Sequence, residues 1–204
     1  MYYLVNIYNE YDFEKLRHFD KNIHKSNRIV VNIKDDIIFE EEFIPVDLDG
    51  FDVYIEGNNH TLNSININEE EINAKDYSAM IEKADNLYVK NLKFNNCYIY
   101  GGVKCAVLAA DVSDKVIFEN IDIRDTMVNC EAFCGGLVAR CKELLITNSN
   151  ISVSVYGHDV VGGVVGMTDK YTDQNCLYDI DGIAIGKAIH SEAGYYERKL
   201  TKNN

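Results

Sequence analysis

The stretch GGLVARCKELLITNSNISVSVYGHDVVGGVVG, residues 135–166, opens and closes on nearly the same phrase. Its first five residues read GGLVA, and the five that begin at Gly162, 27 positions later (162 − 135), read GGVVG. Between the two phrases, serines separate the apolar residues Ile151, Val153 and Val155. Such alternation is typical of a β-strand. A phrase that returns after about 20 to 50 residues indicates stacked structural repeats.

Other segments follow the same pattern at steps of about 24 to 32 residues. Four of them align: HTLNSINI (60–67), LKFNNCYI (92–99), VIFENIDI (116–123) and LLITNSNI (144–151). In this alignment Asn96, Asn120 and Asn148 share one column, and CAVLA (105–109) shares the column of the two glycine phrases. Units of this size hold two or three short strands and no helix. The sequence therefore predicts an all-β fold, a parallel β-solenoid.

Both recurring motifs have a physical reason in such a fold. Glycine pairs let the backbone turn a tight corner and leave space for the next coil to lie close by. Stacked asparagines pass amide hydrogen bonds from coil to coil and satisfy backbone groups that a bend frees. We therefore expect the glycines and the asparagines at the corners of the coils.

The N-terminal segment differs from the repeats. Asn9 is a good N-cap for a helix over about 10–20, in which Phe13, Leu16 and Phe19 have helical spacing. A short helix at this end would cover the open edge of the solenoid. We expect one domain overall: strand and capping helix in 1–34, solenoid coils in 35–167, and a degenerate last coil with a tail in 168–204.

The segments YDFEKLRHF, RIVVNI, DIIF, FIPV and FDVYIEGNNHTLNSININ, together with residues 135–166, resemble proteins that carry GLUG repeats. The resemblance covers roughly 5–166 and includes the Gly57–Ile65 segment, GNNHTLNSI. It implies a right-handed parallel β-helix and no particular reaction. His60, within this segment, is expected to be a turn residue that hydrogen-bonds a neighbouring coil.

Charge and composition exclude several classes of protein. The net charge is −13, which disfavours direct binding to nucleic acid, because phosphate contacts need Lys and Arg. No apolar run is long enough for a membrane helix, and the start of the sequence has no basic region typical of a signal peptide. We therefore expect a cytoplasmic protein whose six cysteines are free and mostly buried thiols.

The acidic residues are unevenly placed, since residues 35–74 contain no Lys or Arg. One interpretation is a solvated surface that keeps a β-protein soluble. The other is a negative surface that binds a basic partner. The second interpretation predicts a binding site made of Asp35, Asp36, Glu40, Glu41, Glu42, Asp47, Asp49, Asp52 and Glu56.

Two aromatic residues are candidates to extend this site. Tyr98 and Tyr100 alternate with Ile99, so both are expected to point outward beside each other. Such a pair suits a protein interface, a sugar-stacking platform or an ordinary sheet surface.

No group of residues predicts a catalytic site, a cofactor or a metal. Asp122, Arg124 and Asp125 form the best local group, but no carboxylate aligns with Asp122 in the neighbouring coils, so a surface ion pair is the simpler interpretation. The cysteines Cys105, Cys130, Cys134 and Cys141, with His158, lack the paired spacing of zinc sites. The glycine phrases lack the Lys and Ser or Thr of a phosphate loop.

These patterns favour a non-enzymatic module that binds a protein with a basic surface. The hypothesis that follows is an inhibitor from a phage or mobile element, of the anti-CRISPR type, that acts on a host nuclease. Two alternatives remain open: a carbohydrate-binding or adhesin fragment of a GLUG protein, and a polysaccharide lyase-like enzyme. A homodimer formed through the solenoid end is also compatible with the pattern.

Overall fold

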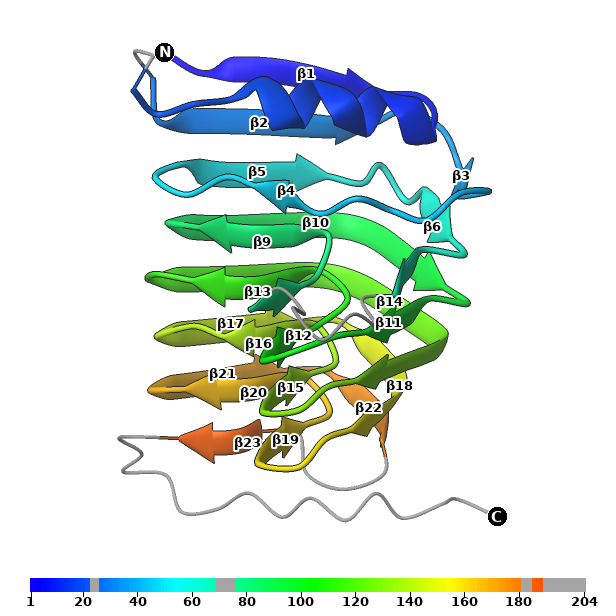
Figure 1. The fold of residues 1–204 in the computed structure, drawn as a ribbon, viewed down its shortest axis with the longest axis vertical. Helices are drawn as coiled ribbons and strands as arrows, with labels where there is room; N and C mark the ends of the chain where they lie inside the picture. Colours follow the sequence, from blue (N-terminus) through cyan, green and yellow to red (C-terminus); the bar gives the residue numbers. More distant parts are fainter. Residues whose placement is uncertain (23–25, 69–75, 181–184, 189–204) are drawn as a thin grey trace.

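The computed structural model describes residues 1–22, 26–68, 76–180 and 185–188 and shows a parallel β-solenoid of about six turns. Figure 1 shows the coils stacked along the long axis, with the N-terminal strand at one end and β23 towards the other. Every strand pair in the three sheets is parallel, as the repeat pattern predicts. The predicted fold class is confirmed.

The largest sheet has 13 strands and bends around the molecule. Its first arm contains β1 (Tyr3–Ile7), β2 (Arg28–Ile33), β5 (Asp52–Glu56), β10 (Asn86–Asn95), β14 (Lys115–Asn129), β17 (Glu143–Thr147) and β21 (Lys170–Gln174). The long strands β10 and β14 continue past the bend, where they pair with shorter strands. This second arm contains β3 (Ile37–Ile38), β6 (Thr61–Asn63), β7 (Asn66–Asn68), β11 (Tyr98–Tyr100), β18 (Asn150–Tyr156) and β22 (Leu177–Ile180). Of these, β6 pairs with β10, and β11 and β18 pair with β14.

Two smaller sheets complete each coil. The four-stranded sheet contains β8 (Tyr77–Ser78), β12 (Lys104–Cys105), β15 (Phe133–Gly135) and β19 (Val160–Gly162). The six-stranded sheet contains β4 (Val46–Asp47), β9 (Ile81–Ala84), β13 (Ala109–Val112), β16 (Val138–Arg140), β20 (Val165–Thr168) and β23 (Ile185–Ala188).

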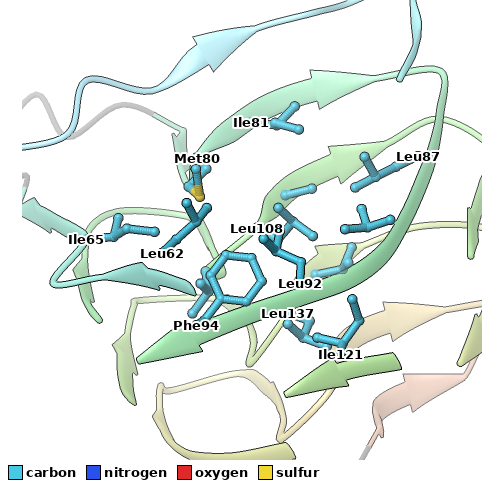
Figure 2. Packing of buried hydrophobic residues seen from close by; sticks show 14 of the residues in the cluster. Leu62, Ile65, Met80, Ile81, Leu87, Leu92, Phe94, Leu108, Ile121 and Leu137 are labelled. Atoms are coloured by element: carbon cyan, nitrogen blue, oxygen red, sulfur yellow. The ribbon is translucent and has the colours of Figure 1, made fainter. Parts of the chain in front are cut away.

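The hydrophobic core runs through the middle of the stack. Alternate residues of each strand point inward, and those at matching positions lie above one another, as Leu62, Phe94 and Ile123 do. Figure 2 shows Leu62, Phe94 and Leu108 directed into the same interior, where each is at most 1% exposed. Each coil thus buries its apolar side chains against those of its neighbours, which is why a single coil would not be stable alone.

Asparagines occupy corners of the coils, and they lie at two different corners instead of sharing a single one. At the first corner Asn91, Asn120, Asn148 and Asn175 all have a positive φ. Asn120 Nδ2 donates to Asn91 Oδ1 at 2.8 Å, and Asn175 Nδ2 donates to Asn148 Oδ1 at 3.3 Å. The predicted passing of amide hydrogen bonds between coils is confirmed.

The second corner contains Ser64, Asn96 and Asp125, which also have positive φ values. Asn96 Nδ2 donates to Ser64 Oγ at 3.1 Å. The alignment of Asn96 with Asn120 was therefore wrong, because Phe94 pairs with Ile123 and Leu87 pairs with Val116. At both corners a strand with alternating apolar residues ends in a polar residue. The two corners therefore have similar sequences, which is why the alignment placed Asn96 and Asn120 in one column.

The glycine phrases lie where neighbouring coils come closest. A Cβ on Gly136 would lie 2.1 Å from the carbonyl oxygen of Gly163 in the next coil, and one on Gly135 would lie 1.8 Å from the Val138 carbonyl oxygen. The predicted close approach is confirmed. CAVLA is shifted by one residue from its expected place, since Cys105 pairs with Cys134 and not with Gly135.

The N-terminal helix η1 (Glu10–His18) is a 3-10 helix with Asn9 as its N-cap, and Asn9 Oδ1 accepts a hydrogen bond from the Tyr11 N–H at 3.1 Å. Phe13 and Leu16 are buried on its inner side. Figure 1 shows η1 beside β1 and β2 at the end of the stack. The predicted capping helix is confirmed, although its hydrogen bonds are those of the tighter helix type.

The cysteine prediction was wrong for one pair. Cys130 and Cys134 form a disulfide with a Cα–Cα distance of 5.9 Å, because the turn between β14 and β15 brings residues four apart face to face. Cys97, Cys105 and Cys141 are free and buried, and Cys176 is free and half-buried. Burial raises the pKa of the Cys97 thiol to about 11. Across the described residues no helix is long and apolar enough to cross a membrane.

Candidate functional site

The acidic residues between Asp35 and Glu56 are spread around one coil of the solenoid. Asp47 lies on β4 in the six-stranded sheet, whereas Asp52 and Glu56 lie on β5 in the large sheet, on a different side of the coil. Glu40, Glu41 and Glu42 lie between β3 and β4. A stretch of about 22 residues makes nearly one full turn, so its side chains point outward in all directions. The structure therefore does not bring the nine predicted acidic residues together on one face.

Several of these carboxylates stabilise neighbouring parts of the chain. Asp36 Oδ1 accepts the Thr61 N–H at 2.7 Å and lies 3.3 Å from His60 Nδ1. The Thr61 N–H, with smaller help from His60, holds the pKa of Asp36 below its ordinary value. This contact places His60 against the preceding coil, as predicted for a turn residue. Asp49 pairs with Lys21.

The two acidic residues of β5 also have partners in the next coil. Asp52 accepts a hydrogen bond from Asn86 Nδ2 at 2.8 Å. Glu56 pairs with Lys90 at 2.9 Å and accepts Asn91 Nδ2 at 3.0 Å. Burial alone would raise the pKa of Glu56, but these donors outweigh it and hold the pKa below the ordinary value. Both side chains support the stack of coils.

The three consecutive glutamates have a different environment. Phe39 and Phe43 are each 5% exposed, and the glutamates between them are exposed. Both rings pack on Phe13 of η1, with centroids 5.6 Å and 5.4 Å away, and they lie 5.4 Å from each other. The two buried rings thus fix residues 39–43 to the helix, and we call this segment the acidic turn. Its shape forces Glu40 and Glu41 into solvent.

Exposed apolar side chains surround the acidic turn. Tyr11 is 67% exposed, Ile38 is 64% exposed and Ile44 is 58% exposed. The Glu40 N–H donates to Glu10 Oε2 at 2.9 Å, and Arg17 Nη2 donates to the Ile44 carbonyl at 2.6 Å, so helix and turn are tied at both ends.

Several carboxylates of this region lie close enough to the Tyr11 hydroxyl to act on it electrostatically. The nearby carboxylates raise the pKa of Tyr11, Glu10 most and then Glu41. We define the acidic turn patch as Glu10, Tyr11, Ile38, Glu40, Glu41 and Ile44.

Tyr98 and Tyr100 point outward from β11, as predicted, while Ile99 between them is fully buried. Tyr98 is 42% exposed and Tyr100 is half-buried. They lie far along the chain from the acidic turn, on the arm of the sheet formed by β7, β11, β14 and β18. In register with them on the following coils lie Met127, 38% exposed, and Tyr156, 50% exposed.

A recess of about 360 Å³ opens beside these residues. It forms where β14 has an extra residue relative to β18, between Ile123 and Thr126, and where Asp125 takes a φ of 48°. Asp125 and Asp179 supply two carboxylates. The rest of the lining is Thr126, Met127, Ser152, Val153 and Ser154.

The remaining chemical candidates do not form a centre. Arg124 binds Asp122 through two hydrogen bonds of 2.9 Å and 2.7 Å, and its side chain is 64% exposed, which is a surface ion pair. The disulfide removes Cys130 and Cys134 as thiolate ligands. In the ranges that the structure describes, no three His, Cys, Asp or Glu side chains are grouped closely enough to hold a metal ion.

Sequence reasoning missed several members of these surfaces. The FEEEF motif, with a phenylalanine at each end, does signal an anchored acidic turn. No local signal marks Tyr11 as its neighbour, because the folded helix brings it there. Asp179 was missed for a similar reason: it pairs in register with Ser152, one coil away, and the repeat had become too weak to align.

No family model matches the chain, and no curated protein matches it. One solved structure that is similar to the chain is described as that of a "putative immunoglobulin A1 protease" from Bacteroides ovatus, with 14% sequence identity and a TM-score of 0.48. The alignment covers 93% of this chain and 80% of that one. The resemblance to GLUG-repeat proteins stays a prediction from the sequence.

Proposed function

We propose that the chain is a protein-binding β-solenoid that contacts a basic partner through the acidic turn patch. The observation that carries the proposal is the acidic turn itself, where two buried phenylalanines hold three glutamates outward next to exposed Tyr11. The resemblance to GLUG repeats implies a scaffold with no particular reaction, which agrees with a binding role.

The physical chemistry of the patch suits recognition of a cationic protein surface. Its position on a packed aromatic cluster keeps the side chains preorganised, which lowers the entropy lost on binding. Tyr11, Ile38 and Ile44 supply apolar area, while Glu10, Glu40 and Glu41 supply charge. The net charge of −13 adds long-range attraction to a positive partner.

The partner class that fits best is a nucleic-acid-binding enzyme, whose binding groove is rich in Lys and Arg. A carboxylate-rich turn in such a groove would compete with the phosphates of the substrate. This makes the chain an inhibitor of a nuclease, of the anti-CRISPR type, acting in the cytoplasm of a bacterial host.

The test compares three tagged baits in lysates of low-GC bacteria, with bound proteins identified by mass spectrometry at low and high salt. The baits are the wild type, Glu40→Lys with Glu41→Lys, and Glu131→Lys with Asp159→Lys. The last pair changes net charge equally at exposed residues in other coils. We expect a nuclease that the wild type and the control retain at low salt and the first variant loses. Retention by the first variant would refute the proposal.

A second candidate function is carbohydrate binding at the recess. Two carboxylates and two serines can accept and donate hydrogen bonds to sugar hydroxyls, and the exposed rings of Tyr98 and Tyr156 lie on the adjoining surface. The volume of about 360 Å³ is in the range of small-molecule sites. A glycan array tests this: signal that Asp179→Asn and Tyr156→Ala each reduce would support it, and an empty array would refute it.

A further inference from the structure

The outward face of the first arm of the large sheet has an apolar column that crosses six of its seven strands and ends at Thr172 of β21. Register places one outward residue of each strand in this column, from β1 to β17: Leu4, Val30, Tyr54, Tyr88, Ile117 and Leu145. Leu4 is 54% exposed, and the other members are half-buried, as expected on a flat sheet open to solvent.

Two of the aromatic rings in the column are preorganised. Tyr54 and Tyr88 stack with their centroids 4.5 Å apart and their planes at 7°, and the Arg28 guanidinium lies 4.9 Å from the Tyr54 ring. Rigid rings of this kind lose little conformational entropy when a partner covers them. The stripe is therefore a preformed contact surface.

A ladder of polar residues follows one edge of the column and shows what the surface fits. In the order of the coils it contains Arg28, Asp52, Asn86, Lys115, Glu143 and Lys170. The register of Leu87 with Val116 places Lys115 directly after Asn86 in this ladder. From Arg28 to Glu143 the charges read plus, minus, neutral, plus, minus, so this part of the ladder is antisymmetric about Asn86. Inside each chain Glu143 also pairs with Lys115 at 3.5 Å and with Lys170 at 2.8 Å.

A two-fold contact between identical surfaces needs antisymmetry of this kind. In such a contact, if one residue faces a second residue of the other copy, that second residue also faces the first, so the two must carry opposite charges. A two-fold axis through β10, parallel to its strand direction, places Asp52 opposite Lys115 of the second copy. It also places Arg28 opposite Glu143 of that copy. The same axis puts Tyr88 on Tyr88, Tyr54 on Ile117 and Val30 on Leu145. We infer that this face forms a homodimer of two solenoids packed back to back with their long axes reversed.

The other edge of the column limits the strength of the dimer. On that edge the axis places Glu56 opposite Glu119 of the second copy and Lys90 opposite Lys90, so like charges face each other. Inside each chain Lys90 is already paired with Glu56. The face spans seven strands about 4.8 Å apart and five residues of about 3.3 Å each, so its footprint is ~550 Å² per copy. This is at the small end for specific interfaces, and we expect a weak dimer that dissociates on dilution.

A charge swap tests the inference, with molar mass measured by sedimentation equilibrium over a wide concentration range. Asp52→Lys places two ammonium groups opposite each other, and Lys115→Asp places two carboxylates there, so either change alone should abolish the dimer. The double variant restores opposite charges and should recover at least a large part of the association. Thermal melts of each variant show that the fold is retained.

A second pair of variants distinguishes this face from the arm of the sheet that contains β11. Tyr88→Lys introduces two charges at the axis and should keep the protein monomeric, whereas Tyr98→Lys, on a different arm of the sheet, should leave the dimer unchanged. A wild type that stays monomeric up to millimolar concentration would overturn the inference. So would a dimer that survives Tyr88→Lys, or a double charge swap that remains monomeric although it is folded.

Discussion

The Gly136 corner and the acidic turn show two opposite uses of a coil. At Gly136 the backbone of the next coil lies so close that even a methyl group has no space, because Gly163 O would be 2.1 Å from a Cβ. At the acidic turn, two buried phenylalanines support three exposed glutamates. Contact between main chains of neighbouring coils determines which residues fit at the Gly136 corner. At the acidic turn the anchoring rings fix the backbone, and the exposed side chains determine what the surface can bind.

The difference shows where this molecule has freedom to evolve a binding surface. A corner that contacts its neighbours through main-chain atoms admits few substitutions, so its recurrence in the sequence reports the fold. A turn that projects from an anchored pair of rings accepts any polar residue at its tip. Function is therefore expected in the turns and on outward strand faces, and the repeat motif carries little information about it.

The largest effect is expected at the glycine corner. Gly136→Ala would press a methyl group against main-chain atoms of Gly163 and against Val153 Cγ1 at 2.8 Å, so the coils must separate. We expect a loss of about 4 kcal/mol or more in the free energy of unfolding, or no folded protein at all. Urea denaturation followed by circular dichroism measures it. Ser154→Ala, on an outward strand position, is the control, and a Gly136→Ala protein as stable as that control would contradict the close packing.

A smaller but still large effect is expected at the base of the acidic turn. Phe43→Ala removes a ring that is 5% exposed and packs on Phe13 and Phe39, and should cost about 3 to 4 kcal/mol. Glu41→Ala at the tip of the same turn should change stability by less than about 0.5 kcal/mol. Both values come from urea denaturation. Equal losses at base and tip would show that the turn is not anchored as described.

The sequence was sufficient to predict the class of fold, because alternation and repetition are properties of single strands and single coils. Asn9 as helix cap and Ile99 as an inward residue between two outward tyrosines are local in the same way. The register was harder. Asn96 and Asn120 have similar apolar surroundings, and only the three-dimensional bend shows that they belong to different corners.

The candidate surfaces were harder still, since they depend on which side of a coil a residue occupies. The nine acidic residues looked like one site in a linear chain, and a coil distributes them around the axis. The Cys130–Cys134 disulfide depends on the path of one turn, and a spacing of four residues does not specify that path. Tyr11 joins Glu40 and Glu41 only because η1 packs on Phe39 and Phe43.

The asparagine corner lies between the two extremes, because it combines a backbone requirement with a side-chain bond. Asn120 has a φ of 55° and donates to Asn91 Oδ1 at 2.8 Å. Asn120→Gly loses the side-chain hydrogen bonds to Asn91 and Asn59 and should cost about 1 kcal/mol. Asn120→Ala loses the same bonds and, unlike glycine, keeps a Cβ in the left-handed region without the polar side chain that lets asparagine adopt it, so it should cost about 1 to 2 kcal/mol more than Asn120→Gly. Thermal denaturation of the two variants measures the difference, and equal stabilities would refute a backbone contribution.

The smallest effect is expected for a charge that supports the stack from outside. Glu56 has a lowered pKa in the folded protein, so its contribution to stability is fully present above its ordinary pKa of 4.5 and is lost as pH falls through the folded value. Glu56→Gln should therefore be less stable than wild type at pH 7, by less than about 1 kcal/mol for a partly exposed pair. The gap should close as the pH falls through the folded pKa of Glu56, because the wild-type carboxylate is then protonated. Urea denaturation at several pH values measures both curves. A gap that stays constant from pH 7 to pH 3 would mean that Glu56 acts through its shape and not through its charge.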